Sequence, residues 1–234
     1  MRNSPEKHDS GALEQSLVYG KNPVTELLKS GAGVDTVLLS EGLPDAVASY
    51  YTALAKQAGA VVKRVHPNKL RLSCGTDSHQ GVAAYASSIT YASLEDLLAA
   101  AREKGEAPFL VLADGVEDPH NLGAVIRSAL LCGAHGVVIP KRGGAAVTPT
   151  VLKSSAGAAA RLPVARVANI GESIRRLKEQ GVFVYCADMD GQPLEKADLT
   201  AVSLSMAGRG TGVDSFNVSV AAGIILYEIA RQRR

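Results

Sequence analysis

The sequence is poor in cysteine and aromatic residues and has no long apolar run. Its three cysteines are far apart and show no CxxC or metal-ligand spacing, which argues against a disulfide framework and favours a reduced, cytoplasmic setting. No apolar stretch is long enough for a membrane span, and the polar first ten residues lack a signal-peptide pattern. A net charge of only +2 does not by itself indicate nucleic-acid binding, so an RNA partner would need local basic patches.

The composition that remains is typical of a folded α/β protein. Hydrophobic residues make up 46% of the 234 residues and charged residues 21%, enough for one large or two modest domains. Changes in composition predict a disordered tail over 1–15, a small α/β domain over 16–88, a linker helix within 89–106 and a second α/β domain over 107–234.

In the first domain, apolar periodicity and turn residues predict short alternating elements. The helix over 44–58 should turn Ala46, Tyr50, Leu54 and Ala58 inward. The remaining elements are a helix over 23–29 and strands over 34–39, 61–65 and 81–86. The helix opened by Ser93 should act as a connector between the two domains.

Residues 109–140 form the most informative stretch, a predicted strand, helix and strand. The apolar run from Phe109 to Ala113 is typical of a buried parallel strand. Asp118 can cap the following helix, and Pro119 suits its first turn because its missing N–H is not needed there. The apolar side of this helix comprises Leu122, Val125, Ile126, Ala129 and Leu130.

Polar residues gather where the first of these strands meets the helix. His120, Gly123 and Arg127 should share a face turned away from the core, and Asn121 lies on the first turn, whose free amides suit an anion. The alternative is a solvated helix face with one ordinary surface arginine.

The second half continues the alternation, with strands over 162–167 and 181–187, a helix over 170–180 and a final helix over 215–233. This order predicts a parallel sheet with helices on both faces. The apolar stripe of the final helix, which suits a core or a dimer interface, comprises Val218, Ala221, Ala222, Ile225 and Ile229.

Two segments make the sequence recognisable. Asp118–Ala129 closely resembles the first motif of the SpoU/TrmH family of RNA 2'-O-ribose methyltransferases, in the SPOUT superfamily, and Asp214–Ala222 resembles its third motif. Tyr19–Val24 and His79–Val82 resemble parts of the family's N-terminal RNA-binding domain, which has a ribosomal-protein-like α/β fold. The resemblance implies a catalytic domain with a trefoil knot, S-adenosylmethionine as cofactor, a homodimer and no metal. The closest resemblance is to bacterial enzymes that modify a guanosine of 23S rRNA.

The resemblance also implies roles for individual residues. Arg127, Asn121, Ser215 and Asn217 would be catalytic, Arg127 by holding phosphate and stabilising developing negative charge and the others by orienting the ribose and the loop. Leu204 and Phe216 would contact the cofactor. The basic surface of the N-terminal domain would include Lys21, Lys63 and Arg64; the alternative for each one taken singly is an ordinary solvated side chain.

One motif of the family is absent. Relatives carry a strand and a Gly-x-Glu-Gly-x-Gly loop after the position of Thr200, whereas here Thr200 is followed directly by Ala201–Met206. About twenty-five residues are therefore missing, which should leave a position in the sheet empty and remove part of the knot. Besides an active methyltransferase, the sequence therefore allows a non-catalytic RNA-binding relative or, from another class, a small-molecule α/β enzyme.

Overall fold

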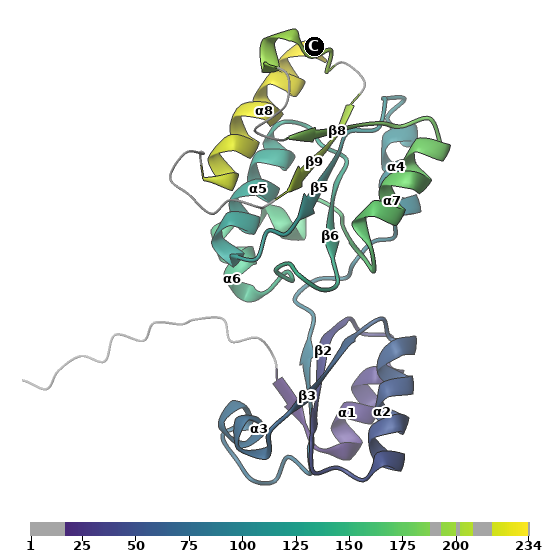
Figure 1. The fold of residues 1–234 in the computed structure, drawn as a ribbon, viewed down its shortest axis with the longest axis vertical. Coiled ribbons are helices and arrows are strands. Elements are labelled where there is room, and N and C mark those ends of the chain that lie inside the picture. The colour runs from purple at the N-terminus through teal and green to yellow at the C-terminus, as the bar shows by residue number, and fades with distance from the viewer. Residues whose placement is uncertain (1–16, 188–192, 200–201, 208–216, 234) are drawn as a thin grey trace, which may run out of the picture.

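The protein is described by a computed structural model that covers residues 17–187, 193–199, 202–207 and 217–233. The predicted tail over 1–15 lies outside the described residues. The chain forms two α/β units, each with its own sheet, stacked one above the other in Figure 1. The predicted fold class, a small N-terminal α/β unit followed by a parallel α/β unit, is confirmed.

The N-terminal unit is a four-stranded sheet in the order β1-β4-β2-β3 with helices on both faces. Apolar side chains of α1 and α2 pack on one face, and Leu70 of α3 packs on the other. Its strands are β1 (Leu17–Tyr19), β2 (Val34–Ser40), β3 (Val61–Val65) and β4 (Val82–Ala86), and its helices are α1 (Lys21–Lys29), α2 (Asp45–Gln57) and α3 (Pro67–Cys74). Helix α3 was not predicted from the sequence; His66 caps it by accepting a hydrogen bond from the amide of Asn68.

The predicted inward face of α2 is right for Leu54 and Ala58, which pack against the core, and wrong for Ala46 and Tyr50, which are exposed. Tyr51 is 3% exposed, whereas Tyr50, predicted to point inward, is 46% exposed. The Tyr51 hydroxyl donates a hydrogen bond to the Lys21 carbonyl at 2.8 Å, so this ring ties α2 to the start of α1. Burial of Tyr51 is tolerated because this bond satisfies its hydroxyl, whereas the exposed hydroxyl of Tyr50 can bond to water.

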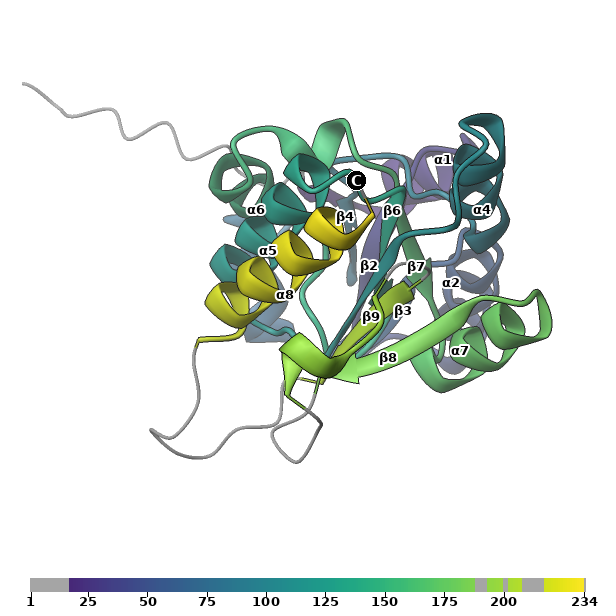
Figure 2. The same cartoon turned by 90° about the horizontal axis from the view of Figure 1, so that it is seen from above.

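The second unit is a five-stranded parallel sheet in the order β7-β6-β5-β9-β8. Helices α5, α6 and α8 cover one face, and α4 and α7 cover the other (Figures 1 and 2). The strands are β5 (Leu110–Asp114), β6 (Gly136–Pro140), β7 (Val164–Val167), β8 (Phe183–Ala187) and β9 (Val202–Ala207). The helices are α4 (Leu94–Glu103), α5 (Pro119–Leu131), α6 (Pro149–Ser154), α7 (Ile170–Glu179) and α8 (Val218–Gln232), with short 3-10 turns η1 (Ala158–Ala160) and η2 (Leu194–Lys196).

The expected empty position in this sheet is not found among the described strands. β9 pairs on one side with β5, where Leu204 lies opposite Val111, and on the other with β8, where Leu204 lies opposite Tyr185. The sheet is therefore continuous from β7 to β8. The trefoil knot would involve the chain path through 208–216, which lies outside the described residues.

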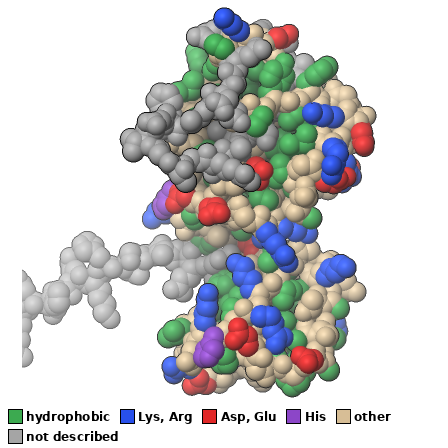
Figure 3. All heavy atoms as spheres, viewed as in Figure 1, with side chains coloured by type: hydrophobic (Ala, Val, Ile, Leu, Met, Phe, Trp, Pro, Cys, Tyr) green, Lys and Arg blue, Asp and Glu red, His purple; other side chains and the backbone are tan. Residues whose placement is uncertain are grey.

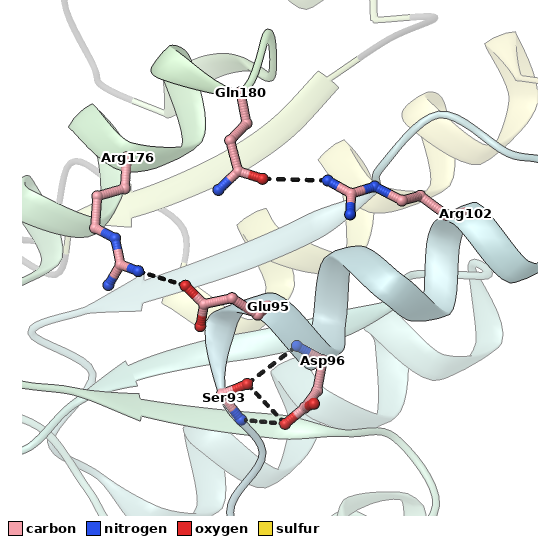
Figure 4. Close-up of polar contacts among 6 residues, drawn as sticks. All are labelled: Ser93, Glu95, Asp96, Arg102, Arg176 and Gln180. Carbon is pink, nitrogen blue, oxygen red and sulfur yellow. Dashed lines mark hydrogen bonds and ion pairs between the residues drawn. The ribbon is translucent and has the colours of Figure 1, made fainter.

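Helix α4 belongs to the second unit rather than standing free between the two. Leu94, Leu97 and Leu98 are buried against the sheet and against Leu177 of α7. Figure 4 shows the polar contacts at its surface: Ser93 and Asp96 cap the helix, Arg176 pairs with Glu95, and Arg102 donates to Gln180 at 3.3 Å. The predicted connector thus covers one face of the parallel sheet, because its apolar stripe has to be buried.

The final helix α8 packs with its predicted stripe toward the core, although the burial is uneven. Ala222 and Ile229 are fully buried, together with Leu226, which was not predicted. The remaining residues of the stripe, Val218, Ala221 and Ile225, are partly buried against the same core. Among the described residues, no helix combines the length and apolarity that a membrane span needs.

Candidate functional site

The residues predicted to carry the chemistry meet at one edge of the parallel sheet. β5 and β9 end side by side, with Asp114 opposite Ala207, and α5 begins directly after β5. In open parallel sheets, ligands bind outside the carboxyl ends of the strands, because helix N-termini and loops converge there. This edge is therefore the candidate site.

The start of α5 is built as predicted. The Asp118 carboxylate accepts a hydrogen bond from the amide of Asn121 at 2.8 Å, and Pro119 occupies the first turn. This cap fixes the position of the Asn121 backbone and leaves its side-chain amide to make contacts elsewhere.

Asn217 joins α8 to α5 at this edge. Its side-chain NH₂ donates to Oδ1 of Asn121 at 3.1 Å. Its own Oδ1 accepts from the Ser219 amide at 2.9 Å, which caps α8. The two asparagines predicted from separate motifs are thus in direct contact, although 96 residues separate them in the sequence.

Gly123 does not share the open face predicted for it. It is buried where α5 crosses α6, and a Cβ atom there would lie 1.9 Å from the Ser154 hydroxyl. The Ser154 hydroxyl in turn donates to the Pro119 carbonyl at 3.2 Å. The spacing of residues along α5 carries no information about α6, so it did not predict this packing or the contribution of Ser154.

His120 and Arg127 are exposed on α5, as predicted. Among the described residues, no hydrogen bond or ion pair involves the Arg127 side chain, so its guanidinium is available to a ligand. It lies more than one helical turn beyond Asn121, and within the described part of the chain no hydrogen bond joins the two side chains.

The two predicted cofactor residues are only partly placed. The backbone of Leu204 lies in the middle of β9, inside the sheet. Phe216, together with Ser215 of the catalytic set, lies outside the described residues. Their roles stay predictions.

The predicted RNA-binding residues do not form one cluster. Lys63 and Arg64 lie on β3, whereas Lys21 is the first residue of α1, which follows β1 after Gly20. The strands β1 and β3 are the two outer strands of the sheet. All three side chains are exposed, and Arg64 donates to the Glu41 carbonyl at 3.2 Å.

Each of the two units matches a known protein family. Residues 17–92 match the RNA 2'-O ribose methyltransferase substrate-binding domain, and residues 108–209 match the SpoU rRNA Methylase family. Among the solved structures, the chain is similar to the SpoU methyltransferase AviRb from Streptomyces viridochromogenes, with a TM-score of 0.51, 25% identity and coverage of 93% of this chain and 89% of AviRb. A structure of AviRb in complex with AdoMet gives the same TM-score of 0.51 at 24% identity, which shows a shared fold.

Curated relatives extend over nearly the whole chain. A putative TrmH family tRNA/rRNA methyltransferase, YacO of Bacillus subtilis, is 39% identical over 246 aligned positions, covering 94% of this chain and 97% of YacO. An uncharacterized tRNA/rRNA methyltransferase of Mycobacterium tuberculosis is 34% identical and covers 100% of this chain and 79% of its own length. With both domains matched in order and a relative of 39% identity spanning its length, this chain belongs to the SpoU/TrmH family of RNA 2'-O-ribose methyltransferases.

Proposed function

We propose that this protein transfers a methyl group from S-adenosylmethionine to a ribose 2'-hydroxyl, that of a guanosine in 23S rRNA. The observation that carries the proposal is the hydrogen bond between Asn217 and Asn121, which joins the first and third motifs at the carboxyl edge of the sheet. The names of the relatives support RNA as the substrate, and the AdoMet complex of AviRb supports the cofactor.

The described residues fit such a cofactor in one respect. The carboxyl ends of β5 and β9 lie side by side and open toward the N-termini of α5 and α8, the arrangement that holds ligands in open parallel sheets. Leu204 and Phe216 would contact the cofactor, as the family motifs imply. When bound, S-adenosylmethionine supplies an electrophilic methyl group.

The protein itself would orient the ribose and stabilise the negative charge that develops on its 2'-oxygen. A 2'-hydroxyl is a weak nucleophile at neutral pH, so holding it in line with the methyl should supply much of the acceleration. Asn121 and Asn217, held by each other and by their helix starts, can orient the ribose through their amide groups. Ser215 would add a hydroxyl to this set.

Arg127 is the residue we assign to the phosphate next to the reacting ribose. A guanidinium loses its proton only above a pKa of about 12, so Arg127 is unsuited to act as a general base. Its planar donors instead suit a phosphate, and its charge would stabilise the developing oxyanion. Replacing Arg127 with Ala should abolish methyl transfer and leave cofactor affinity unchanged, because the residue contacts RNA rather than the cofactor.

We further propose that the active protein is a cytoplasmic homodimer. One side of α8 exposes three large apolar residues at helical spacing, Val220 at 49%, Ile224 at 47% and Tyr227 at 66%. An exposed apolar stripe of this kind suits a helix-to-helix interface. Sedimentation equilibrium at micromolar concentration should give a dimer, and a folded monomer would contradict the proposal.

A non-catalytic RNA-binding relative is the second candidate, and one observation favours it. The alignment with YacO spans 246 positions but covers 94% of the 234 residues here, so about 26 aligned positions have no residue in this chain. This number agrees with the segment expected to be missing after Thr200. A lost cofactor loop would weaken S-adenosylmethionine binding by one or more orders of magnitude, at roughly 0.5–1.5 kcal/mol for each lost hydrogen bond.

Calorimetric titration with S-adenosylmethionine, followed by methyl transfer to 23S rRNA, separates the two candidates. Micromolar cofactor binding with turnover on rRNA would support the methyltransferase and show that the missing segment is dispensable. RNA binding without cofactor binding or turnover would instead favour the non-catalytic relative. Turnover on a different RNA would overturn the assignment of the 23S rRNA target alone.

A further inference from the structure

The two units enclose a cleft that the family motifs do not include. A cavity of about 590 Å³ lies between the loops that precede β2 and β3 in the first unit and the ends of β6 and β7 in the second. A second cavity of about 330 Å³ adjoins it, since Gly59 and Lys141 line both. The cleft therefore runs along the junction of the two units.

The walls of this cleft are strongly basic. Five Lys and Arg side chains line the two cavities and no Asp or Glu does: Lys29, Lys56, Lys141, Arg142 and Arg166. Arg166 is occupied by Asp35, but within the described residues no ion pair involves the other four. Figure 3 shows Lys and Arg side chains gathered around the waist between the two units. These four cations have no carboxylate partner among the described residues. They give the cleft a positive potential, which favours the binding of anions.

The geometry of the cleft is held by a buried contact between the units. Arg166 of β7 donates to the Asp35 carboxylate of β2 at 2.8 Å, and these side chains are 7% and 2% exposed. The Arg166 guanidinium also lies over the Tyr91 ring, 5.4 Å from its centroid. Burial, and after it the charge of Asp35, raises the pKa of Tyr91 to about 12. The cations on the two walls are therefore held at a defined separation.

The cleft is connected to the candidate site through one loop. Lys141 and Arg142 begin the segment between β6 and α6, whose Ala145 amide donates to the Val116 carbonyl at 2.9 Å, just before the cap of α5. The Tyr91 hydroxyl accepts from the Val147 amide at 3.0 Å in the same loop. Lys141 and Arg142 thus follow the carboxyl end of β6, on the sheet edge where α5 begins after β5.

We propose that this basic cleft between the two units binds the sugar-phosphate backbone of the RNA next to the nucleotide at the candidate site. The proposal rests on the proposed function for its substrate, and it adds a binding surface shared by both units. Single-stranded RNA suits it, because a strand can follow a groove of cations without needing the geometry of a duplex. The Lys56 and Arg142 side chains would each neutralise one phosphate.

The test compares two double variants of the full chain that remove equal charge. Lys56→Gln/Arg142→Gln changes the cleft, and Lys104→Gln/Lys178→Gln changes exposed lysines at the carboxyl ends of α4 and α7, at the opposite edge of the sheet. Lys141 is kept because its amino group lies against Gly59 across the junction. Affinity for a fluorescein-labelled single-stranded RNA is measured by anisotropy over a series of NaCl concentrations, with circular dichroism to confirm folding.

The cleft variant should bind the RNA more weakly, and its plot of log affinity against log salt should be shallower by about 1.4, at roughly 0.7 per lost phosphate contact. The control variant should keep the slope of the unmodified protein. An unchanged slope in the cleft variant, equal changes in both variants, or no RNA binding by the unmodified protein would overturn the proposal. Calorimetric binding of inorganic pyrophosphate with an unchanged RNA slope would also overturn it and indicate a small-anion site.

Failure of this proposal is distinguishable from failure of the proposed function. If the protein binds the cofactor and transfers methyl groups, but the salt dependence of RNA affinity is unchanged in the cleft variant, the proposed function is supported and the cleft proposal is wrong. If the cleft variant shows the shallower slope but the protein does not bind the cofactor, the cleft proposal is supported and the proposed methyl transfer is wrong.

Discussion

The side-chain amide of Asn217 donates a hydrogen bond to Oδ1 of Asn121 at 3.1 Å, and through this contact the start of α8 is tied to the start of α5. Each asparagine also takes part in the capping of its own helix, Asn121 through its backbone and Asn217 through its side chain. The contact therefore couples the position of two helix N-termini at the same sheet edge. Substitutions at Asn217 can therefore distinguish its capping of α8 from its contact with Asn121.

Asn217→Asp and Asn217→Ala should differ in a defined way. Aspartate keeps an oxygen that accepts from the Ser219 amide but has no NH₂ to give to Asn121, whereas alanine loses both functions. Alanine should lower the free energy of unfolding by about 0.5–2 kcal/mol and aspartate should not, because Asp is a good helix cap. Urea unfolding measures this difference. If methyl transfer is lost in both variants, the contact with Asn121 matters for activity; full activity in Asn217→Asp would contradict its positioning role.

Gly123→Ala should destabilise the protein. The added Cβ would lie 1.9 Å from the Ser154 hydroxyl and 2.9 Å from the Ser155 backbone nitrogen, so α6 would have to move. Overpacking of this kind costs about 1–3 kcal/mol. The matched control is Gly223→Ala in α8, where the closest atom is Ser128 Oγ at 3.8 Å and alanine should be neutral or stabilising. Thermal unfolding compares the two, and equal melting temperatures would contradict the packing described here.

Removing Asp35 should destabilise the contact between the units more than removing the whole pair. Asp35→Ala leaves the buried Arg166 charge without its carboxylate, which typically costs about 3–5 kcal/mol. The double variant Asp35→Ala/Arg166→Met removes the charge as well and should recover part of that loss. Denaturant unfolding of both variants and of Arg166→Met completes a double-mutant cycle. Additive effects would show that the two charges do not depend on each other.

The stability of the second unit should fall in mild acid because of His135. Burial, with a further contribution from Lys104, lowers the pKa of His135, and the opposing charge of Glu106 only partly offsets this. Its Nδ1 accepts from the Phe109 amide at 3.0 Å, which requires that nitrogen to be unprotonated.

Since the folded protein holds the His135 proton less tightly than the unfolded chain, the unfolded state takes up more protons below the ordinary value of 6.5. The free energy of unfolding should therefore decrease as the pH falls below about 6.5. His135→Asn keeps an acceptor for the Phe109 amide without a titrating ring, and it should flatten this dependence. Urea unfolding across this pH range is the measurement, and an unchanged pH dependence in the variant would contradict the assignment.

Local signals in the sequence determined the elements around the candidate site. The limits of α5, its Asp118 cap and its apolar side follow from residues within a few positions of one another, and the structure confirms them. The family assignment rests on two such local segments, Asp118–Ala129 and Asp214–Ala222, and is confirmed over most of the chain. Because capping, proline and helical periodicity act over one or two turns, a single sequence is enough to predict them.

Tertiary structure alone decided what lies beside these elements. Tyr50 and Tyr51 are adjacent and chemically alike, so only the position of α1 selects Tyr51 for burial. β9 closes the sheet between β5 and β8, where the sequence predicted an empty position, because strand order depends on the path of the whole chain. The Asn121–Asn217 contact and the basic cleft join residues from distant segments, and no local pattern encodes such a distance. Packing of separate elements, rather than the preferences of any one of them, therefore set the geometry on which the proposed function depends.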